Sequence, residues 1–155
     1  MDLSEISHKK VVRVIKKLKR RKAVGIDNIQ AEVLQALLSY DKSIDLLAFF
    51  FSECWRQKST PLAWHGARVS AIFKKGDPAL CSNYRPISFL CIIYKVFAAI
   101  MLERLISAGA AERVWSTQFG FRPGSGTANA FFLVRRIIDR LYDNANLDGI
   151  LLALD

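Results

Sequence analysis

The sequence has few cysteines and histidines, and neither set forms a recognisable metal or disulfide motif. Its three cysteines include no Cys-x-x-Cys pair, and an odd number argues against the disulfide framework of small secreted domains. The two histidines, His8 and His65, are too far apart in the sequence to make a local metal box. We therefore expect reduced cysteines and no histidine-based metal site.

Long apolar runs and targeting segments are also missing. The best apolar run, from Phe89 to Leu102, is interrupted by Lys95 and is shorter than the roughly 18 residues that a membrane-spanning helix needs. The N-terminus lacks a basic stretch followed by an apolar one and a cleavage site. These absences predict a protein without a membrane span that works inside the cell, in the nucleus or the cytoplasm.

Two common kinds of catalytic motif are absent as well. There is no Gly-x-Ser-x-Gly, and nothing in the spacing pairs a serine or cysteine with either histidine. The glycine-rich stretch 118–127 does not match a Walker loop, because Ser125 occupies the position of the second glycine, and it fails as Gly-x-Gly-x-x-Gly at Asn129. These observations exclude serine and cysteine hydrolases and a Walker-type nucleotide site.

What is present fits one globular α+β domain. Of 155 residues, 52% are hydrophobic and 24% are charged, enough apolar surface to offset chain entropy. Apolar periodicity predicts helices over about 8–21, 31–39, 43–56 and 92–107 and one that Thr127 caps, and alternation predicts strands over 67–74 and 84–90. The apolar run Gly149 to Leu154 predicts a buried strand that ends at Asp155.

Positive charge is concentrated at the N-terminus. Residues 1–22 hold nine lysines and arginines against Asp2 and Glu5, a net charge of +7 out of a total of +9. Such a patch attracts nucleic acid by releasing counterions from the phosphate backbone. It also fits the solvated face of an amphipathic helix, and composition alone leaves both interpretations open.

Two sets of residues are candidates for phosphate chemistry. A carboxylate at the end of a buried strand is a recurring metal ligand, so Asp155 is either such a ligand or the first residue of a surface turn. Four cations of the predicted hairpin would bind a nucleoside triphosphate if they converge and otherwise only raise solubility. These cations are Arg68, Lys74, Lys75 and Arg85.

The stretch 118–127 precedes a predicted helix N-terminus, where backbone amides bind anions such as a nucleic-acid phosphate. A tight turn that caps the helix is the alternative, and the residues alone do not decide between them.

Five stretches, taken in order, resemble the reverse transcriptases of LINE-type retrotransposons, which lack long terminal repeats. They are Lys22-Ala-Val-Gly-Ile-Asp27, Ile72-Phe-Lys-Lys-Gly-Asp-Pro78, Cys81-Ser-Asn-Tyr-Arg-Pro-Ile-Ser88, Gln118-Phe-Gly-Phe-Arg-Pro-Gly124 and Leu151-Leu-Ala-Leu-Asp155. The resemblance covers almost the whole chain. It implies an α+β fold that is the mostly helical fingers portion of a right-hand polymerase, with a small antiparallel strand pair and one strand of a truncated palm sheet.

The resemblance also implies a function: template-directed nucleotidyl transfer from dNTPs onto a DNA primer along an RNA template, with Mg²⁺ or Mn²⁺ as cofactor. Asp155 matches the first metal-binding, catalytic aspartate of the palm, and Lys74, Lys75 and Arg85 match the contacts to the dNTP. The residues that match the contacts to nucleic acid are Gln118, Phe119, Gly120, Phe121, Arg122 and Gly124.

The sequence departs from the family pattern at several positions. Val24, Ile26 and Asn28 replace two prolines and a glycine, and Ser125 stands where arginine is common. Because residues 1–155 hold one palm aspartate and lack the remaining palm and thumb, we expect this partial domain to be catalytically incomplete. The alternatives are a noncatalytic, basic nucleic-acid-binding module and an inert, truncated remnant of a retroelement.

Overall fold

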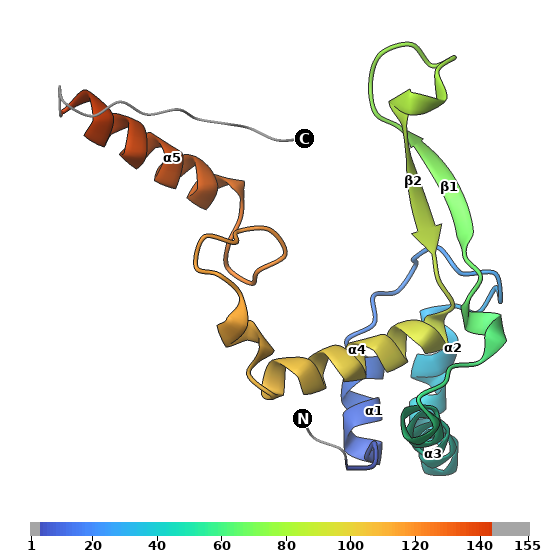
Figure 1. Ribbon diagram of the computed structural model, residues 1–155. Coiled ribbons are helices and arrows are strands. Elements are labelled where there is room, and N and C mark those ends of the chain that lie inside the picture. The colour runs from blue at the N-terminus through green and yellow to red at the C-terminus, as the bar shows by residue number, and fades with distance from the viewer. Residues whose placement is uncertain (1–3, 144–155) are drawn as a thin grey trace. The chain divides into compact units, whose positions relative to one another are not determined.

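The computed structural model describes residues 4–143. The chain divides into two compact units, Met1–Ala108 and Gly109–Asp155. The described residues form five α-helices and one antiparallel pair of strands (Figure 1). The α+β class expected from the sequence is therefore confirmed. Within residues 4–143, no helix is both long enough and apolar enough to cross a membrane.

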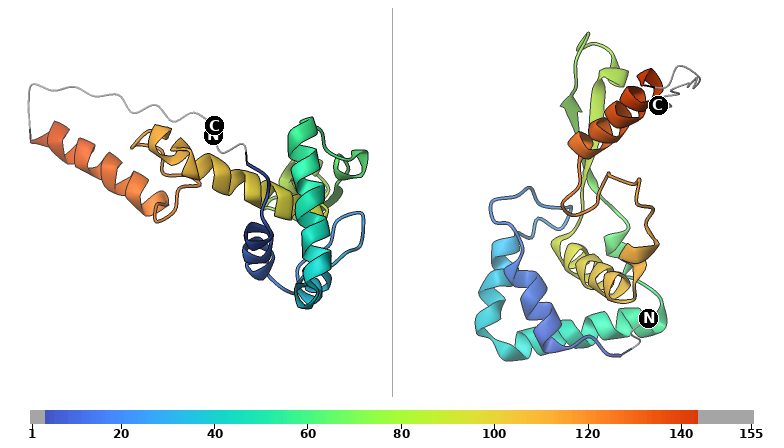
Figure 2. Two further views of the ribbon diagram at one scale, coloured as in Figure 1. Left: turned by 90° about the horizontal axis from the view of Figure 1, so that it is seen from below. Right: turned by 90° about the vertical axis from the view of Figure 1, so that its left-hand side faces the viewer.

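Four helices of the first unit form its helical part. They are α1 (His8–Lys16), α2 (Ala31–Ala36), α3 (Asp41–Gln57) and α4 (Ile92–Ser107). Helix α1 contacts each of the other three (Figure 2). It presents Val11, Val14 and Ile15 to them, at the i, i+3, i+4 spacing that places side chains on one face of a helix. The short 3-10 helix η1 (Leu37–Ser39) continues α2, so this helical stretch spans the predicted range 31–39.

Helix α1 is shorter than the predicted helix 8–21, because the chain turns back toward α2 after Lys17. The Gln35 side-chain amide donates to the Leu18 carbonyl over 2.9 Å, and the Arg20 Nε donates to Gln35 Oε1 over 2.7 Å. Arg21 adopts a left-handed φ of 54°, and its backbone N–H donates to Glu32. Contacts with α2 thus satisfy the Leu18 carbonyl and the Arg21 N–H, which a longer helix would have paired within itself. A longer helix would also have placed like charges, such as Lys16 and Arg20, next to each other at i, i+4.

Aromatic side chains fill the centre of the first unit. Phe51 of α3, which is fully buried, lies 5.7 Å from Phe97 of α4 between ring centroids. Trp64, from the 3-10 helix η2 (Leu62–Trp64), contacts both of them and also Phe50 and Tyr94. This cluster holds α3 against α4 and fixes the point at which the chain leaves for the first strand.

The strands β1 (Arg68–Phe73) and β2 (Tyr84–Phe89) form a hairpin that projects from the helices of the same unit (Figure 1). Their register pairs Arg68 with Phe89 and Phe73 with Tyr84, as the predicted antiparallel pair requires. Every β1 side chain is exposed. The hairpin therefore offers both faces to a ligand or partner.

The second unit contains the 3-10 helix η4 (Ala110–Arg113), a loop, and α5 (Thr127–Tyr142). The prediction that Thr127 caps α5 is wrong, since Thr127 is the first helical residue and Gly126 is the cap. The Asn129 side-chain oxygen accepts the Gly126 N–H over 2.9 Å, which satisfies one donor at the helix start. No residue of α5 is buried.

Candidate nucleotide and nucleic-acid interface

The hairpin places two of its predicted cations on one face. Arg85 pairs with Ile72 across the sheet, and paired residues of antiparallel strands share a face. Lys74 is two residues beyond Ile72, and its N–H continues the ladder to the Asn83 carbonyl over 2.7 Å. Lys74 and Arg85 are therefore diagonal neighbours, about 7–8 Å apart at the backbone. Their long side chains can reach one triphosphate together.

The hairpin does not bring all four cations together. Arg68 lies four residues from Ile72 along β1, about 13 Å away at strand spacing, and its guanidinium donates to Asn28 Oδ1 over 2.9 Å. Lys75 follows the last ladder hydrogen bond and lies in the turn. The four predicted cations thus separate into three groups: Lys74 and Arg85 on one face, Lys75 at the tip, and Arg68 at the base of the hairpin.

Hydrogen bonds within the hairpin tip hold it in shape. The Asn83 amide donates to the Asp77 carbonyl over 2.8 Å, and the Tyr84 hydroxyl donates to the Pro78 carbonyl over 2.9 Å. Gly76 has a φ of 92°, a left-handed conformation that favours glycine. Arg85 precedes Pro86, which keeps Arg85 extended. The two cations are thereby presented from a backbone that is already ordered.

Asn28 occupies a position where the family pattern has glycine, and its φ is 55°. Asparagine tolerates this left-handed conformation better than most residues do. Here its side chain also accepts the hydrogen bond from Arg68. Asn28 thus adopts a left-handed turn conformation and adds a contact to β1 that the sequence did not predict.

The predicted nucleic-acid loop lies in the second unit and exposes an aromatic ring. Phe121 is fully exposed at a φ of 60°, while Phe119 is half-buried. The Arg122 guanidinium donates to the Trp115 carbonyl over 3.5 Å, and the Gln118 amide donates to the Gly120 carbonyl over 3.2 Å. Gly124 has a φ of 72°, which a side chain would strain.

An exposed ring beside an arginine is the combination that stacks bases and neutralises phosphates in single-strand binding sites. The sequence did not single out Trp115, which is exposed as well and lies next to Arg122 in the loop.

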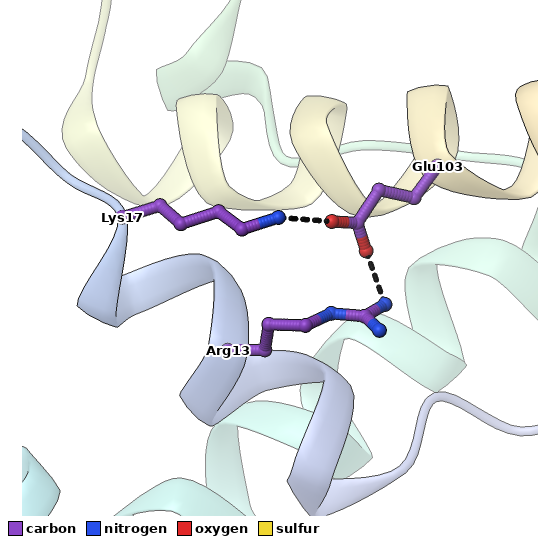
Figure 3. A network of polar contacts seen from close by, with 3 residues as sticks. All are labelled: Arg13, Lys17 and Glu103. Carbon is purple, nitrogen blue, oxygen red and sulfur yellow. Dashed lines mark hydrogen bonds and ion pairs between the residues drawn. The ribbon is translucent and has the colours of Figure 1, made fainter.

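A second missed residue is Glu103 of α4. Its carboxylate accepts hydrogen bonds from Arg13 over 2.5 Å and from Lys17 over 3.2 Å (Figure 3). Two of the nine cations in residues 1–22 are therefore paired with a carboxylate. Partial burial raises the pKa of Glu103, but the hydrogen bonds from Lys17 and Arg13 outweigh it and hold the pKa below its ordinary value. The available sequence signal is that Glu103 is the one acidic residue between Asp77 and Glu112.

Metal ligands do not gather within the described part of the chain. Residues 4–143 contain no group of three or more histidine, cysteine or acidic side chains that could hold a metal ion. Asp155 and the predicted strand 149–154 lie outside the described residues. Residues 4–143 therefore do not by themselves form a site for a divalent metal.

No family model matches the chain, but several known proteins are similar to it. The chain is 30% identical over 146 residues to the probable RNA-directed DNA polymerase from transposon BS of Drosophila melanogaster, across 93% of this chain and 16% of that protein. It is 30% identical over 129 residues to the RNA-directed DNA polymerase from mobile element jockey of the same fly, across 82% of this chain and 14% of that protein.

The probable RNA-directed DNA polymerase from transposon X-element, also from Drosophila melanogaster, is 33% identical over 136 residues, across 86% of this chain and 15% of that protein. The chain thus spans about one seventh of the length of these relatives. The similarity extends over most of this chain, which thus resembles one part of the reverse transcriptases of LINE-type retrotransposons.

Proposed function

We propose that this chain forms the fingers portion and the first edge of the palm of a right-hand RNA-directed DNA polymerase. Its substrates are dNTPs, an RNA template and a DNA primer, and it works inside the cell, in the nucleus or the cytoplasm. The observation that carries the proposal is the similarity to RNA-directed DNA polymerases over as much as 93% of the chain. The shared face of Lys74 and Arg85 on an exposed hairpin supports it.

The role proposed for the hairpin is to bind the triphosphate of the incoming nucleotide. Nucleotidyl transfer forms a bond from the primer 3′ oxygen to the α-phosphorus and breaks the bond from that phosphorus to the bridging oxygen, so that pyrophosphate leaves with the electron pair. Arg85 offers a planar fork for two phosphate oxygens, and Lys74 offers a compact point charge. Both hold the triphosphate in place and stabilise the charge that develops on the leaving group, and Lys75 adds charge at the tip.

The role proposed for the loop is to contact template and primer. Phe121 provides a face for base stacking, Arg122 a phosphate contact, and Gly120 and Gly124 a backbone that nucleic acid can approach closely. Gln118 and Phe119 complete this contact. Asp155 would be one ligand of Mg²⁺ or Mn²⁺, which would neutralise charge at the reacting phosphate when bound. The remaining palm and thumb are the proposed protein partners.

The test is a titration of the 155-residue chain with dATP and Mg²⁺, followed through backbone amide resonances. We expect shifts at residues 72–75 and 83–86. The substitution Arg85→Gln keeps a polar side chain but removes the charge, and it should weaken binding about tenfold, as expected for one charge-assisted contact. Lys42→Gln, which removes an exposed cation of α3, is the matched control and should bind like the wild type. Equal binding by Arg85→Gln, or shifts that avoid the hairpin, would contradict the proposal.

A further inference from the structure

The solvent face of α1 is a basic stripe. Lys9, Arg13 and Lys16 recur at i, i+4 and i+7, on the side opposite to the buried Val11 and Val14. All three cations are exposed. Within residues 4–143, the side chains of Lys9 and Lys16 make no hydrogen bond or ion pair, so their charges face solvent.

Acidic side chains flank this stripe on both sides. On the α3 side, the His8 Nδ1 lies 2.7 Å from Asp45 Oδ1 and the His8 Nε2 lies 3.8 Å from Asp41 Oδ1. On the α4 side, Glu103 accepts from both Arg13 and Lys17 (Figure 3). The two sides differ because Glu103 is paired with one arginine and one lysine side chain, Arg13 of the stripe and Lys17.

The ion pairs of Glu103 orient Arg13 and Lys17, but they are exposed enough for another anion to replace the carboxylate. The Arg13 side chain is 55% exposed and the Lys17 side chain 67%, whereas Glu103 is 29% exposed. Ion pairs between such exposed cations and a carboxylate contribute little net free energy, because water and salt compete for both partners. A polyanion that brings several phosphates at once competes better than dissolved salt does, because it releases its own counterions.

We propose that the solvent face of α1 binds the phosphate backbone of nucleic acid, and that Glu103 competes with phosphate for Arg13 and Lys17. This inference rests on the proposed function and specifies a contact surface for it. Lys9 and Lys16 meet the backbone first. Arg13 and Lys17 exchange Glu103 for phosphate when the strand is in place, so Glu103 lowers the affinity for nucleic acid that contacts these two cations.

The experiment measures binding of a fluorescent 20-nucleotide single-stranded RNA to the 155-residue chain by anisotropy, at several concentrations of KCl. Glu103→Gln removes the competing charge and should bind about two- to fivefold more tightly, the range expected for the loss of weak ion pairs. Glu112→Gln changes the net charge equally but removes an exposed carboxylate of η4, and it serves as the matched control. DNA of the same sequence should show the same gain, since the sugar and bases take no part.

A double-mutant cycle separates competition from a general charge effect. In the background Arg13→Gln plus Lys17→Gln, the wild-type Glu103 has no cations to hold, so Glu103→Gln should give no gain beyond the control. A second variant, Glu103→Asp, keeps the net charge and shortens the side chain, and it should show part of the gain. Melting curves of each variant report whether α1 stays folded.

The outcomes distinguish this inference from the proposed function. If the wild-type chain shows no salt-dependent binding to RNA, the proposed function fails. If the wild type binds but Glu103→Gln tracks Glu112→Gln, or gains equally in both backgrounds, the competition is refuted while the proposed function stands. A gain with RNA that is absent with DNA would refute recognition through the phosphate backbone.

Discussion

Substitution of Gly25 by alanine tests the packing that joins the segment before α2 to the end of the hairpin. A Cβ at Gly25 would lie 2.7 Å from the Cys91 nitrogen and from the Leu90 carbonyl carbon, and 2.8 Å from the Leu90 oxygen. All three atoms are backbone, so no side-chain rotation relieves the overlap. The two segments must separate by about 0.7 Å to reach ordinary contact at 3.4 Å.

Such overpacking costs about 1–3 kcal/mol in other proteins. For a unit of this size, each kcal/mol lowers the melting temperature by about 4–8 °C. Thermal unfolding followed by far-UV circular dichroism measures the effect. The matched control is Gly66→Ala in the same unit, where the new Cβ would lie 2.9 Å from the end of the Ile26 side chain, which can move. A Gly25→Ala chain that melts at the temperature of the Gly66→Ala chain would refute the close backbone approach.

Three further predictions concern the core, the loop and the ion pairs. Phe51→Ala should destabilise the chain by about 3–5 kcal/mol because it empties a buried site, whereas Phe49→Ala, on the exposed side of α3, should leave urea unfolding unchanged; equal effects would contradict the core. Phe121→Ala should weaken RNA binding without lowering the melting temperature, since the ring is fully exposed, and unchanged RNA affinity would refute stacking. The lowered pKa of Glu103 means that its ion pairs stabilise the fold above the ordinary value of about 4.5 and that this contribution is lost as the pH falls through the lowered pKa. The stability difference between wild type and Glu103→Gln, measured by urea unfolding from pH 7 to pH 3, should therefore shrink toward acid, and a constant difference would show that the ion pairs do not contribute.

Local patterns predicted most of the secondary structure. Apolar side chains over residues 92–107 predicted α4 with its observed bounds, Ile92–Ser107. The alternation over 67–74 and 84–90, with turn residues between, predicted β1 and β2 within one residue at each end. These elements are determined by nearby residues, so a sequence pattern suffices for them.

The features that sequence could not predict depend on contacts between distant residues. Nothing between Lys17 and Lys22 breaks a helix, and α1 ends early because Gln35 bonds to the Leu18 carbonyl from 17 residues away. The bonds from Arg13 and Lys17 to Glu103 span 90 and 86 residues. In the same way, Asn28 takes Arg68 out of the expected cluster of cations. Each is a tertiary contact that overrides a local preference.

The resonances of the arginine side chains test the central claim most directly. Arg85 is proposed to bind the triphosphate, whereas Arg68, on the same face of the hairpin, is held by Asn28 and serves as an internal reference. The account predicts that dATP with Mg²⁺ shifts the Nε–H signal of Arg85 and leaves that of Arg68 in place. Equal shifts of both signals, or no shift of Arg85 at saturating dATP, would contradict it.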